Sequence, residues 1–389
     1  MPTYSSLSEK GGVTSQIHIA TMEGLKILEE GGNAFDAAIT VSSLLTILLP
    51  YTGSIGGDGF ILASTSNDEL VAYNGSGRSP RDLPVKDYLD EKPERGPLTV
   101  TVPGLVDLWE WVNERYGSMD LALLLHKATS LAENGFYAQE NLVQAIESSK
   151  PSLARYEGGH RVFGWVKMGS LIRFPRLAEI YRAVAREGAD AFYRSGVTEE
   201  IVEELRRYGV PMEYEDFASH RGEEVTPIRC EYGDYELYEL PPNSQGLSTL
   251  QLLKTIEIDE LNKLPFKSPE RIRRFLEIAT MIYRERDRYI ADPNYYKAPV
   301  KKLLSPTYLR EKLSLEPRGR GGVNPRDTTF FITADKYGNL VGFIQSIFYN
   351  FGSGIVALDI PFQSRGAGFA KTENQPNSPA PMKRPLHTL

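Results

Sequence analysis

The chain has 389 residues, 41% hydrophobic and 24% charged, which is enough apolar material for a large core without staples. Its net charge of -7 comes from 44 basic and 51 acidic residues interspersed along the chain, which argues against nucleic acid or acidic membranes as partners. The single cysteine, Cys230, excludes an intramolecular disulfide. No Cys/His cluster has metal-ligand spacing, so we expect neither a metal nor another cofactor.

The start of the chain predicts no export signal. Residues 1–11 are polar and lack the basic, apolar and small-residue order of a signal peptide. The longest apolar stretch, residues 37–50, contains hydroxyl residues and is too short to span a bilayer. We therefore expect a soluble, cytoplasmic protein without membrane contact; a signal removed before this numbering is the alternative.

The N-terminal region predicts two helices, a turn and a strand. Apolar residues at helical spacing predict a helix over 19–28, closed by the glycine pair 31–32. A second helix, over 34–49, is apolar nearly all round and should be buried on more than one side. Four glycines within 53–59 indicate tight turns or close backbone approach, and the strand-like residues 60–63 follow.

Further along, residues 106–205 read as several amphipathic helices separated by glycines. Residues 232–240 alternate as a strand does and stop at two prolines. A long helix is predicted over 271–290. The segment 316–326, rich in Gly, Pro and Arg, predicts an exposed, mobile linker.

The residues after this linker predict a β-hairpin. Strand-like residues 329–333 and 340–344 are joined by a short loop with Gly338 at its left-handed position. In that register Thr328 lies opposite Ser346, give or take one residue for a bulge. Two hydroxyl groups would thus lie side by side, either as reacting groups or as two half-buried strand hydroxyls.

Thr328 could react if it became N-terminal. A threonine hydroxyl needs a base, and a free α-amino group, with a pKa of about 7.7 to 8.0, is a base on the same residue. In an intact precursor the Thr328 hydroxyl would attack the carbonyl of Asp327, form an ester, and lose the upstream chain by hydrolysis. We assign a catalytic role to none of the isolated histidines, which are His18, His126, His160, His220 and His387.

Six segments, in order along the chain, resemble signature segments of γ-glutamyltranspeptidases. They are GGNAFDAA at 31–38, SIGGDGF at 54–60, TVPG at 101–104, DTT at 327–329, GSG at 352–354 and KRPLHT at 383–388. By this resemblance the chain is identified as a member of that family. It implies an α+β N-terminal-nucleophile hydrolase fold, an αββα sandwich with two central antiparallel sheets between helix layers.

The resemblance also implies self-cleavage between Asp327 and Thr328. Residues 1–327 would form the large-subunit region and 328–389 the start of the small-subunit region, associated after cleavage as one structural domain. The family's small subunit, with its oxyanion-hole residues, would extend beyond Leu389. A homo-oligomer is left open.

The implied activity is acyl transfer from a γ-glutamyl amide such as glutathione to water or an amine. Thr328 matches the nucleophile, and Ser346 matches a hydroxyl residue that supports it. Two alternatives stay open: a related amidase that acts on another acyl group, and a non-catalytic relative with a binding or assembly role.

The predicted acyl site departs from the family pattern. Ser76 occupies the position of the family's carboxylate-binding arginine, and Arg78, two residues on and on the same face of a strand, would either reach the carboxylate or cap carbonyl groups. Where the family has polar and acidic groups for the α-amine, this chain has Phe348, Arg365 and Gly368. We expect Arg78, Phe348 and Arg365 to contact the acyl group.

Overall fold

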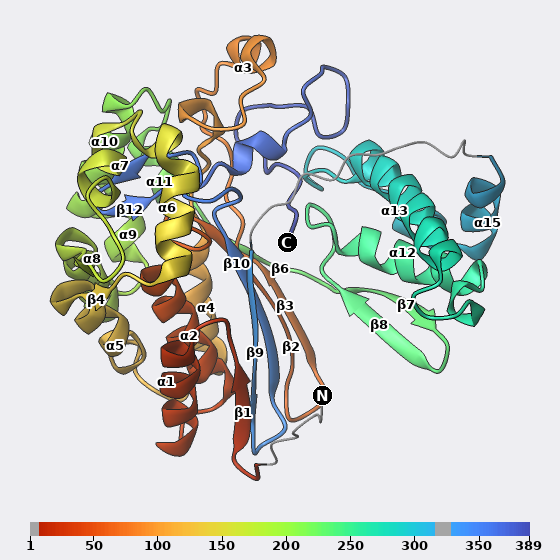
Figure 1. Ribbon diagram of the computed structural model, residues 1–389, viewed down its shortest axis with the longest axis horizontal. Coiled ribbons are helices and arrows are strands. Elements are labelled where there is room, and N and C mark those ends of the chain that lie inside the picture. The colour runs from red at the N-terminus through yellow and green to blue at the C-terminus, as the bar shows by residue number, and fades with distance from the viewer. Residues whose placement is uncertain (1–7, 316–327) are drawn as a thin grey trace.

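A six-stranded antiparallel sheet forms the centre of the protein (Figure 1). The computed structural model describes residues 8–315 and 328–389; the predicted linker 316–326 and Asp327 lie outside the described residues. The strands, in spatial order, are β1 (Gly11–Thr14), β9 (Thr329–Asp335), β10 (Leu340–Ser346), β2 (Asp58–Ser64), β3 (Leu70–Asn74) and β6 (Glu223–Glu224).

The predicted hairpin is confirmed in its strands and its register. β9 and β10 pair from Leu340 opposite Ala334 to Gln345 opposite Thr329, as the sequence predicts. Gly338 has a positive φ of 99° in the connecting loop, where a left-handed residue was expected. The register carries no shift between its two ends, so the side-chain faces are fixed along both strands.

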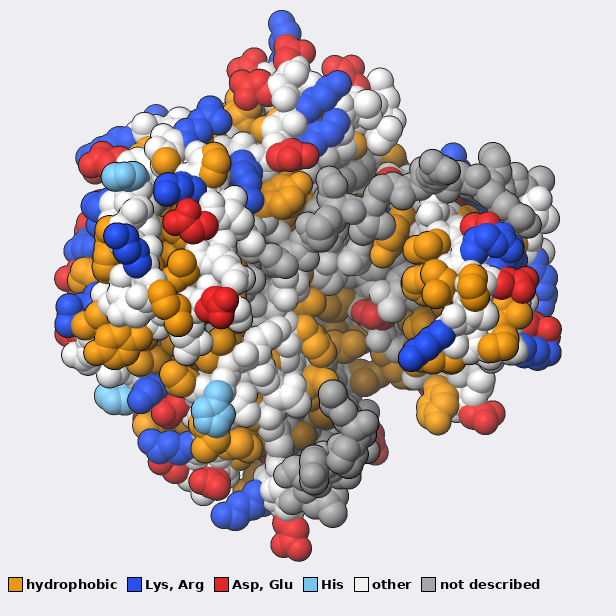
Figure 2. Space-filling model, viewed as in Figure 1, with side chains coloured by type: hydrophobic (Ala, Val, Ile, Leu, Met, Phe, Trp, Pro, Cys, Tyr) orange, Lys and Arg blue, Asp and Glu red, His pale blue; other side chains and the backbone are white. Residues whose placement is uncertain are grey.

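Alternation along the strands gives the sheet two different faces. We call the face with Phe331, Phe343 and Gln345 the inner face, because these side chains are fully buried. The opposite, outer face carries Phe330, whose side chain is 51% exposed, and the half-buried Ile344. Figure 2 shows hydrophobic side chains in the hollow beside this outer face.

Helices cover the inner face. The closest is α2 (Ala34–Leu48), which contacts β9, β10 and the preceding helix α1 (His18–Glu29). Every residue of α2 is buried, as its apolar sequence predicts. Asn33 and Asp36 form a capping box, in which the side chain of each accepts a hydrogen bond from the backbone N–H of the other. These bonds satisfy amides that have no partner within the helix, so the helix begins here.

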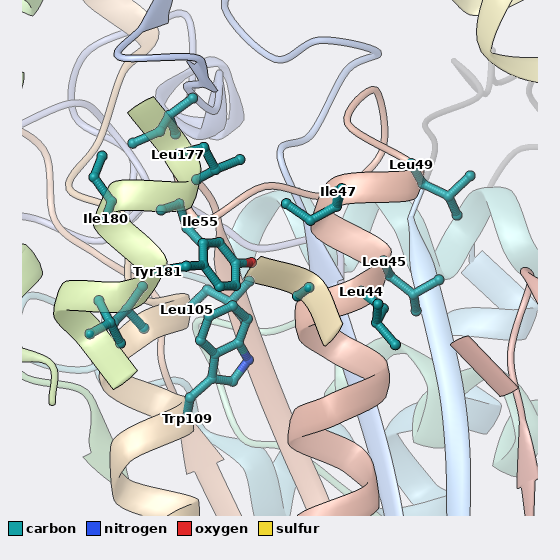
Figure 3. Close-up of a cluster of buried hydrophobic side chains, with 14 of the residues drawn as sticks. Leu44, Leu45, Ile47, Leu49, Ile55, Leu105, Trp109, Leu177, Ile180 and Tyr181 are labelled. Carbon is teal, nitrogen blue, oxygen red and sulfur yellow. The ribbon is translucent and has the colours of Figure 1, made fainter. Parts of the chain in front are cut away.

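Further helices build a layer behind α2. Trp109 of α4 packs against Tyr181 of α8, with ring centroids 5.8 Å apart, and Figure 3 shows both among side chains from α2. These helices are α4 (Leu105–Tyr116), α5 (Leu121–Asn134), α6 (Glu140–Leu153), α7 (Glu157–Phe163), α8 (Pro175–Glu187), α9 (Asp190–Tyr193), α10 (Gly196–Arg207) and α11 (Tyr214–Ala218). The short helix α3 (Val85–Glu91) stands apart from this layer at the top of Figure 1, and its Tyr88 packs with Phe369. Short strands among and after them are β4 (Phe136–Tyr137), β5 (Leu171–Ile172), β11 (Val356–Ala357) and β12 (Ile360–Pro361).

A smaller lobe stands on the other side of the sheet from α1 and α2 (Figure 1). It has its own apolar cluster, which includes Leu247, Ile278 and Ile282. Its elements are β7 (Ile228–Tyr232), β8 (Tyr235–Glu239), α12 (Gly246–Ile258), α13 (Pro269–Tyr289), α14 (Val300–Leu303) and α15 (Pro306–Leu315). No helix in the described ranges is long and apolar enough to cross a membrane.

One predicted element of the lobe is confirmed in part. The strand expected over 232–240 is present as β8, which starts at Tyr235, and it pairs antiparallel with the unpredicted strand β7, with Tyr232 opposite Tyr235. Gly233, with a positive φ of 55°, turns the chain between them, and this short turn was missed. The long helix predicted over 271–290 is confirmed as α13; it starts two residues earlier because Ser268 caps it and Pro269 fills its first position.

Candidate active site

Three residues line up across the outer face at the end of the sheet. In the pairing of β10 with β2, Ser346 lies opposite Asp58. Continuing the β9–β10 register by one residue places Thr328 opposite Ser346. Because directly opposed residues of antiparallel strands share a face, Thr328, Ser346 and Asp58 form a row, which we call the site row. Ser346 and Asp58 are buried, and Thr328 is half-buried.

The residues next to the site row point to the inner face and hold the strand ends. Thr329 shares a hydrogen bond with Thr52, their hydroxyl oxygens 2.9 Å apart. The Ser42 hydroxyl donates to the side-chain carbonyl of Gln345 and accepts from the indole N–H of Trp109 at 2.7 Å. The hydroxyl of Thr329 therefore anchors the strand just behind Thr328.

Ser346 closes β10. Its Oγ accepts a hydrogen bond from the backbone N–H of Phe348 at 2.9 Å. This local bond turns the chain out of the sheet, and Phe348 adopts a positive φ of 83°. The expected support residue of Thr328 thus lies at the point where the strand ends.

Asp58 is fully buried and accepts hydrogen bonds from several donors. Its Oδ1 accepts from the backbone N–H groups of Gly77 and Gly104, both at 3.1 Å, and from Nε2 of Gln363 at 3.0 Å. Its Oδ2 lies 3.0 Å from Nε2 of His387. Burial raises the pKa of Asp58 to about 7, although the positive charge of Arg365 and these hydrogen bonds oppose the rise.

His387 is equally buried and stays neutral. Burial, with the charge of Arg365 adding to it, lowers the pKa of His387 well below its usual value. Its ring packs edge-on against Phe60, with ring centroids 4.6 Å apart. Its backbone N–H donates to the carbonyl of Asn243 at 2.8 Å, which ties this segment to the turn before α12.

The predicted acyl-site residues Phe348 and Arg365 lie against each other. The guanidinium carbon of Arg365 stands 4.6 Å from the centroid of the Phe348 ring, and both side chains are buried. Nη1 of Arg365, in the short helix η3 (Arg365–Gly368), donates to the hydroxyl of Thr388 at 3.3 Å. The pair therefore lies beside two members of the site row: the backbone N–H of Phe348 donates to Ser346, and the charge of Arg365 acts on Asp58.

Arg78 has a partner of its own. Its Nη2 donates to Oε1 of Glu223 at 2.8 Å, and Nη1 of Arg384 donates to the same oxygen at 2.7 Å. Ser76, at the expected arginine position, donates its hydroxyl to the side-chain oxygen of Asn74 at 2.6 Å. The expectation that Arg78 contacts the acyl group stays a prediction, and an ion pair within the chain already holds its guanidinium.

No role was predicted from the sequence for Asp58, His387 or Arg384. Asp58 lies in the glycine-rich segment 54–60, and the other two lie in the segment 383–388, so both segments were recognised as motifs. Asp58 and His387 are 329 residues apart, and no spacing rule connects them. Within the described ranges, no group of three or more His, Cys, Asp or Glu residues could hold a metal ion.

A hydroxyl-lined strand start, set within an antiparallel sheet that helices cover, is the arrangement of N-terminal-nucleophile hydrolases. Residues 20–389 match the family described as Gamma-glutamyltranspeptidase. The chain belongs to this family.

Known relatives agree with this assignment. The chain is 34% identical to the glutathione hydrolase-like YwrD proenzyme of Bacillus subtilis (strain 168), over 99% of this chain and 76% of that protein. It is 31% identical to the oxamate amidohydrolase proenzyme of Klebsiella pneumoniae, with the same coverage of 99% and 76%. The crystal structure of cephalosporin acylase from Bacillus halodurans superposes with a TM-score of 0.89 at 29% identity, covering 100% of this chain and 76% of that one. The expected family, fold class and enzyme class, an amide-bond hydrolase or transferase, are confirmed.

Proposed function

We propose that the chain cleaves itself before Thr328 and that Thr328 then acts as the N-terminal nucleophile of an amide hydrolase or acyltransferase. The site row carries this proposal, because Thr328 directly precedes β9 and the continued β9–β10 register puts it opposite Ser346. The names of the two relatives, both called proenzymes, support it.

Self-cleavage would need no cofactor. Oγ1 of Thr328 attacks the carbonyl carbon of Asp327, the peptide C–N bond breaks, and the proton of the hydroxyl goes to the new amine. Water then hydrolyses the ester, which frees the Asp327 carboxyl group and returns the hydroxyl to Thr328. The product is an N-terminal threonine with its own base.

Turnover repeats the same chemistry on a substrate. The Thr328 amine takes the hydroxyl proton while Oγ1 attacks the amide carbon, and the leaving amine departs with that proton. Water or an acceptor amine then attacks the ester, releases the acyl product, and restores the hydroxyl. Ser346, opposite Thr328, is the proposed hydrogen-bond partner that orients this hydroxyl.

The family name makes a γ-glutamyl group the first candidate for the acyl part. A second candidate is an acyl group without an ammonium, and the buried Arg365–Phe348 pair favours it. A fixed guanidinium repels an α-ammonium and attracts a carboxylate. The names oxamate amidohydrolase and cephalosporin acylase, borne by relatives of this chain, support an acyl group other than glutamyl.

Self-cleavage is tested by denaturing electrophoresis of the purified chain over time, with N-terminal sequencing of the smaller fragment. We expect that fragment to begin at Thr328, Thr328→Ala to stay intact, and Thr328→Ser to cleave slowly because it keeps a hydroxyl. A wild-type chain that stays whole would refute the processing step.

The acyl group is tested with a γ-glutamyl anilide beside a panel of other acyl anilides, including oxalyl and apolar ones. Turnover of the glutamyl compound alone selects the first candidate, and turnover of the others alone selects the second. A processed protein that turns over none of them would favour a binding or assembly role.

A further inference from the structure

Asp58 and His387 form a buried pair that the chemistry of Thr328 does not use. Both side chains are 0% exposed, and their contact joins the first residue of β2 to the segment 383–388. The pair is surrounded by groups that fix it: amides of the chain donate to Asp58, and Phe60 packs on the imidazole. A buried polar pair with this many fixed contacts defines one geometry and tolerates little displacement.

The surroundings decide where the proton lies. Oδ1 of Asp58 faces three donors, which stabilises the carboxylate, and burial keeps the imidazole of His387 neutral. A neutral imidazole has one N–H, and the carboxylate oxygen at 3.0 Å selects the tautomer that carries it on Nε2. Nδ1 is then an acceptor, and no residue of the described ranges donates to it.

Contacts connect this pair to Ser346 in two ways. Directly, Asp58 is the partner of Ser346 across β2 and β10. The second connection starts at Thr388, the residue after His387, whose hydroxyl accepts a hydrogen bond from Arg365. The guanidinium of Arg365 in turn stacks on the ring of Phe348. The N–H of Phe348 in turn donates to Ser346. The two routes form a closed ring of contacts, and the pair is the part of the ring that joins the segment 383–388 to the sheet.

We propose that Asp58 and His387 are positioning residues for the reaction at Thr328. Asp58 holds His387 in the tautomer protonated on Nε2, and the pair fixes the ring of contacts that sets the Ser346 hydroxyl beside Thr328. The role rests on the proposed function of Thr328. Neither residue touches the reacting atoms.

The test uses the full-length chain with Asp58→Asn, His387→Ala, their double variant, and His387→Gln. Asn has nearly the shape of Asp but presents an N–H₂ group to the imidazole, which moves the ring proton to Nδ1. We expect kcat to fall by roughly 10-fold to 100-fold in Asp58→Asn and in His387→Ala, with KM nearly unchanged, as for a small misplacement of reacting groups. The double variant should be no slower than the slower single variant, because both remove one interaction.

Two comparisons separate positioning from folding. His387→Gln keeps an N–H donor within reach of Asp58 and should recover much of the activity lost in His387→Ala. Asp36→Asn is the matched control, because Asp36 is an equally buried carboxylate that accepts from the backbone N–H groups of Asn33 and Ser118. Asp36 lies in the first turn of α2, a helix about 22 Å long, whereas Asp58 follows the last turn of that helix. Asp36→Asn should therefore lower stability and leave kcat per folded enzyme unchanged.

Activity is measured on the acyl anilide that the wild-type enzyme turns over fastest, and the rate of self-cleavage gives a second readout that needs no added substrate. Both rates should fall together in Asp58→Asn and His387→Ala. Unchanged rates, additive losses in the double variant, or an equal loss in Asp36→Asn would each overturn the positioning role. If Thr328→Ala kept its activity, the proposed function itself would fail, which is a different result.

Discussion

His220 should make the protein lose stability in acid. The side chain is buried and stacks on Tyr193, with ring centroids 5.1 Å apart. Its Nε2 has no hydrogen-bond partner among the described residues. Burial lowers the pKa of His220 from 6.5 to about 4, and the nearby Asp107 carboxylate opposes this only in part. The folded protein therefore holds this imidazole neutral over a range where the unfolded chain protonates it.

The sign and size of the effect follow from proton binding. Between pH 6.5 and about 4 the unfolded state binds more protons at this position, so stability falls as the pH falls through that window. Each pH unit is worth about 1.4 kcal/mol, so the complete window is worth about 3 kcal/mol. Above pH 6.5 the group is neutral in both states and contributes no pH dependence.

The variant His220→Phe tests this, because phenylalanine keeps an aromatic ring against Tyr193 and cannot take up a proton. The free energy of unfolding is measured by urea denaturation at about pH 7.5 and about pH 5, with Thr328→Ala in both proteins so that each remains one chain. Between these two conditions the protein with His220 should lose about 2 kcal/mol more than the variant. Equal losses in the two proteins would mean that His220 is not desolvated, and the reasoning would be wrong.

Gly77 cannot accept a side chain, because a Cβ atom there would lie 1.6 Å from the carbonyl oxygen of Val102. Gly77→Ala should therefore sharply reduce soluble yield and self-cleavage, whereas Gly12→Ala, which meets no atom within 4 Å, should leave both near wild type. The acid side of the pH profile of kcat/KM should involve two groups, the Thr328 amine and Asp58, whose pKa burial raises to about 7. Both must lose a proton for activity, so log kcat/KM should rise with a slope of about 2 at the acid end, and of about 1 in Asp58→Asn. A slope of about 1 in both enzymes would mean that activity does not depend on the ionisation of Asp58.

The local parts of the fold were predictable from the sequence. The β9–β10 hairpin follows from alternating residues and one glycine, and α2 from a continuous apolar run that a polar cap precedes. Each of these patterns lies within a short stretch of neighbouring residues, so it can be recognised in the sequence without knowledge of distant contacts. The β7–β8 hairpin was missed because its turn at Gly233 is shorter than the windows in which alternation is read.

The contacts of the site could be predicted only in part. Thr328 and Ser346 come from one hairpin, so the register alone places them together. Glu223, the partner of Arg78, is 145 residues away in the chain, and a pairing at this separation depends on the complete fold. The roles of the site residues, the boundary before Thr328, the cytoplasmic location and the oligomeric state stay predictions.

The place of β9 and β10 in the sheet has a consequence for refolding. Both strands follow Thr328, yet their outer neighbours, β1 and β2, come from the part of the chain before it. Cleavage before Thr328 would thus leave one sheet built from two polypeptides. Neither polypeptide alone contains all the strands of that sheet. The uncut chain can form this sheet within a single molecule. After cleavage the two fragments must first associate, so the yield of refolding after denaturation depends on protein concentration. The uncut chain is then the form that folds efficiently, and the cleaved enzyme should refold far less readily after denaturation than its precursor folds.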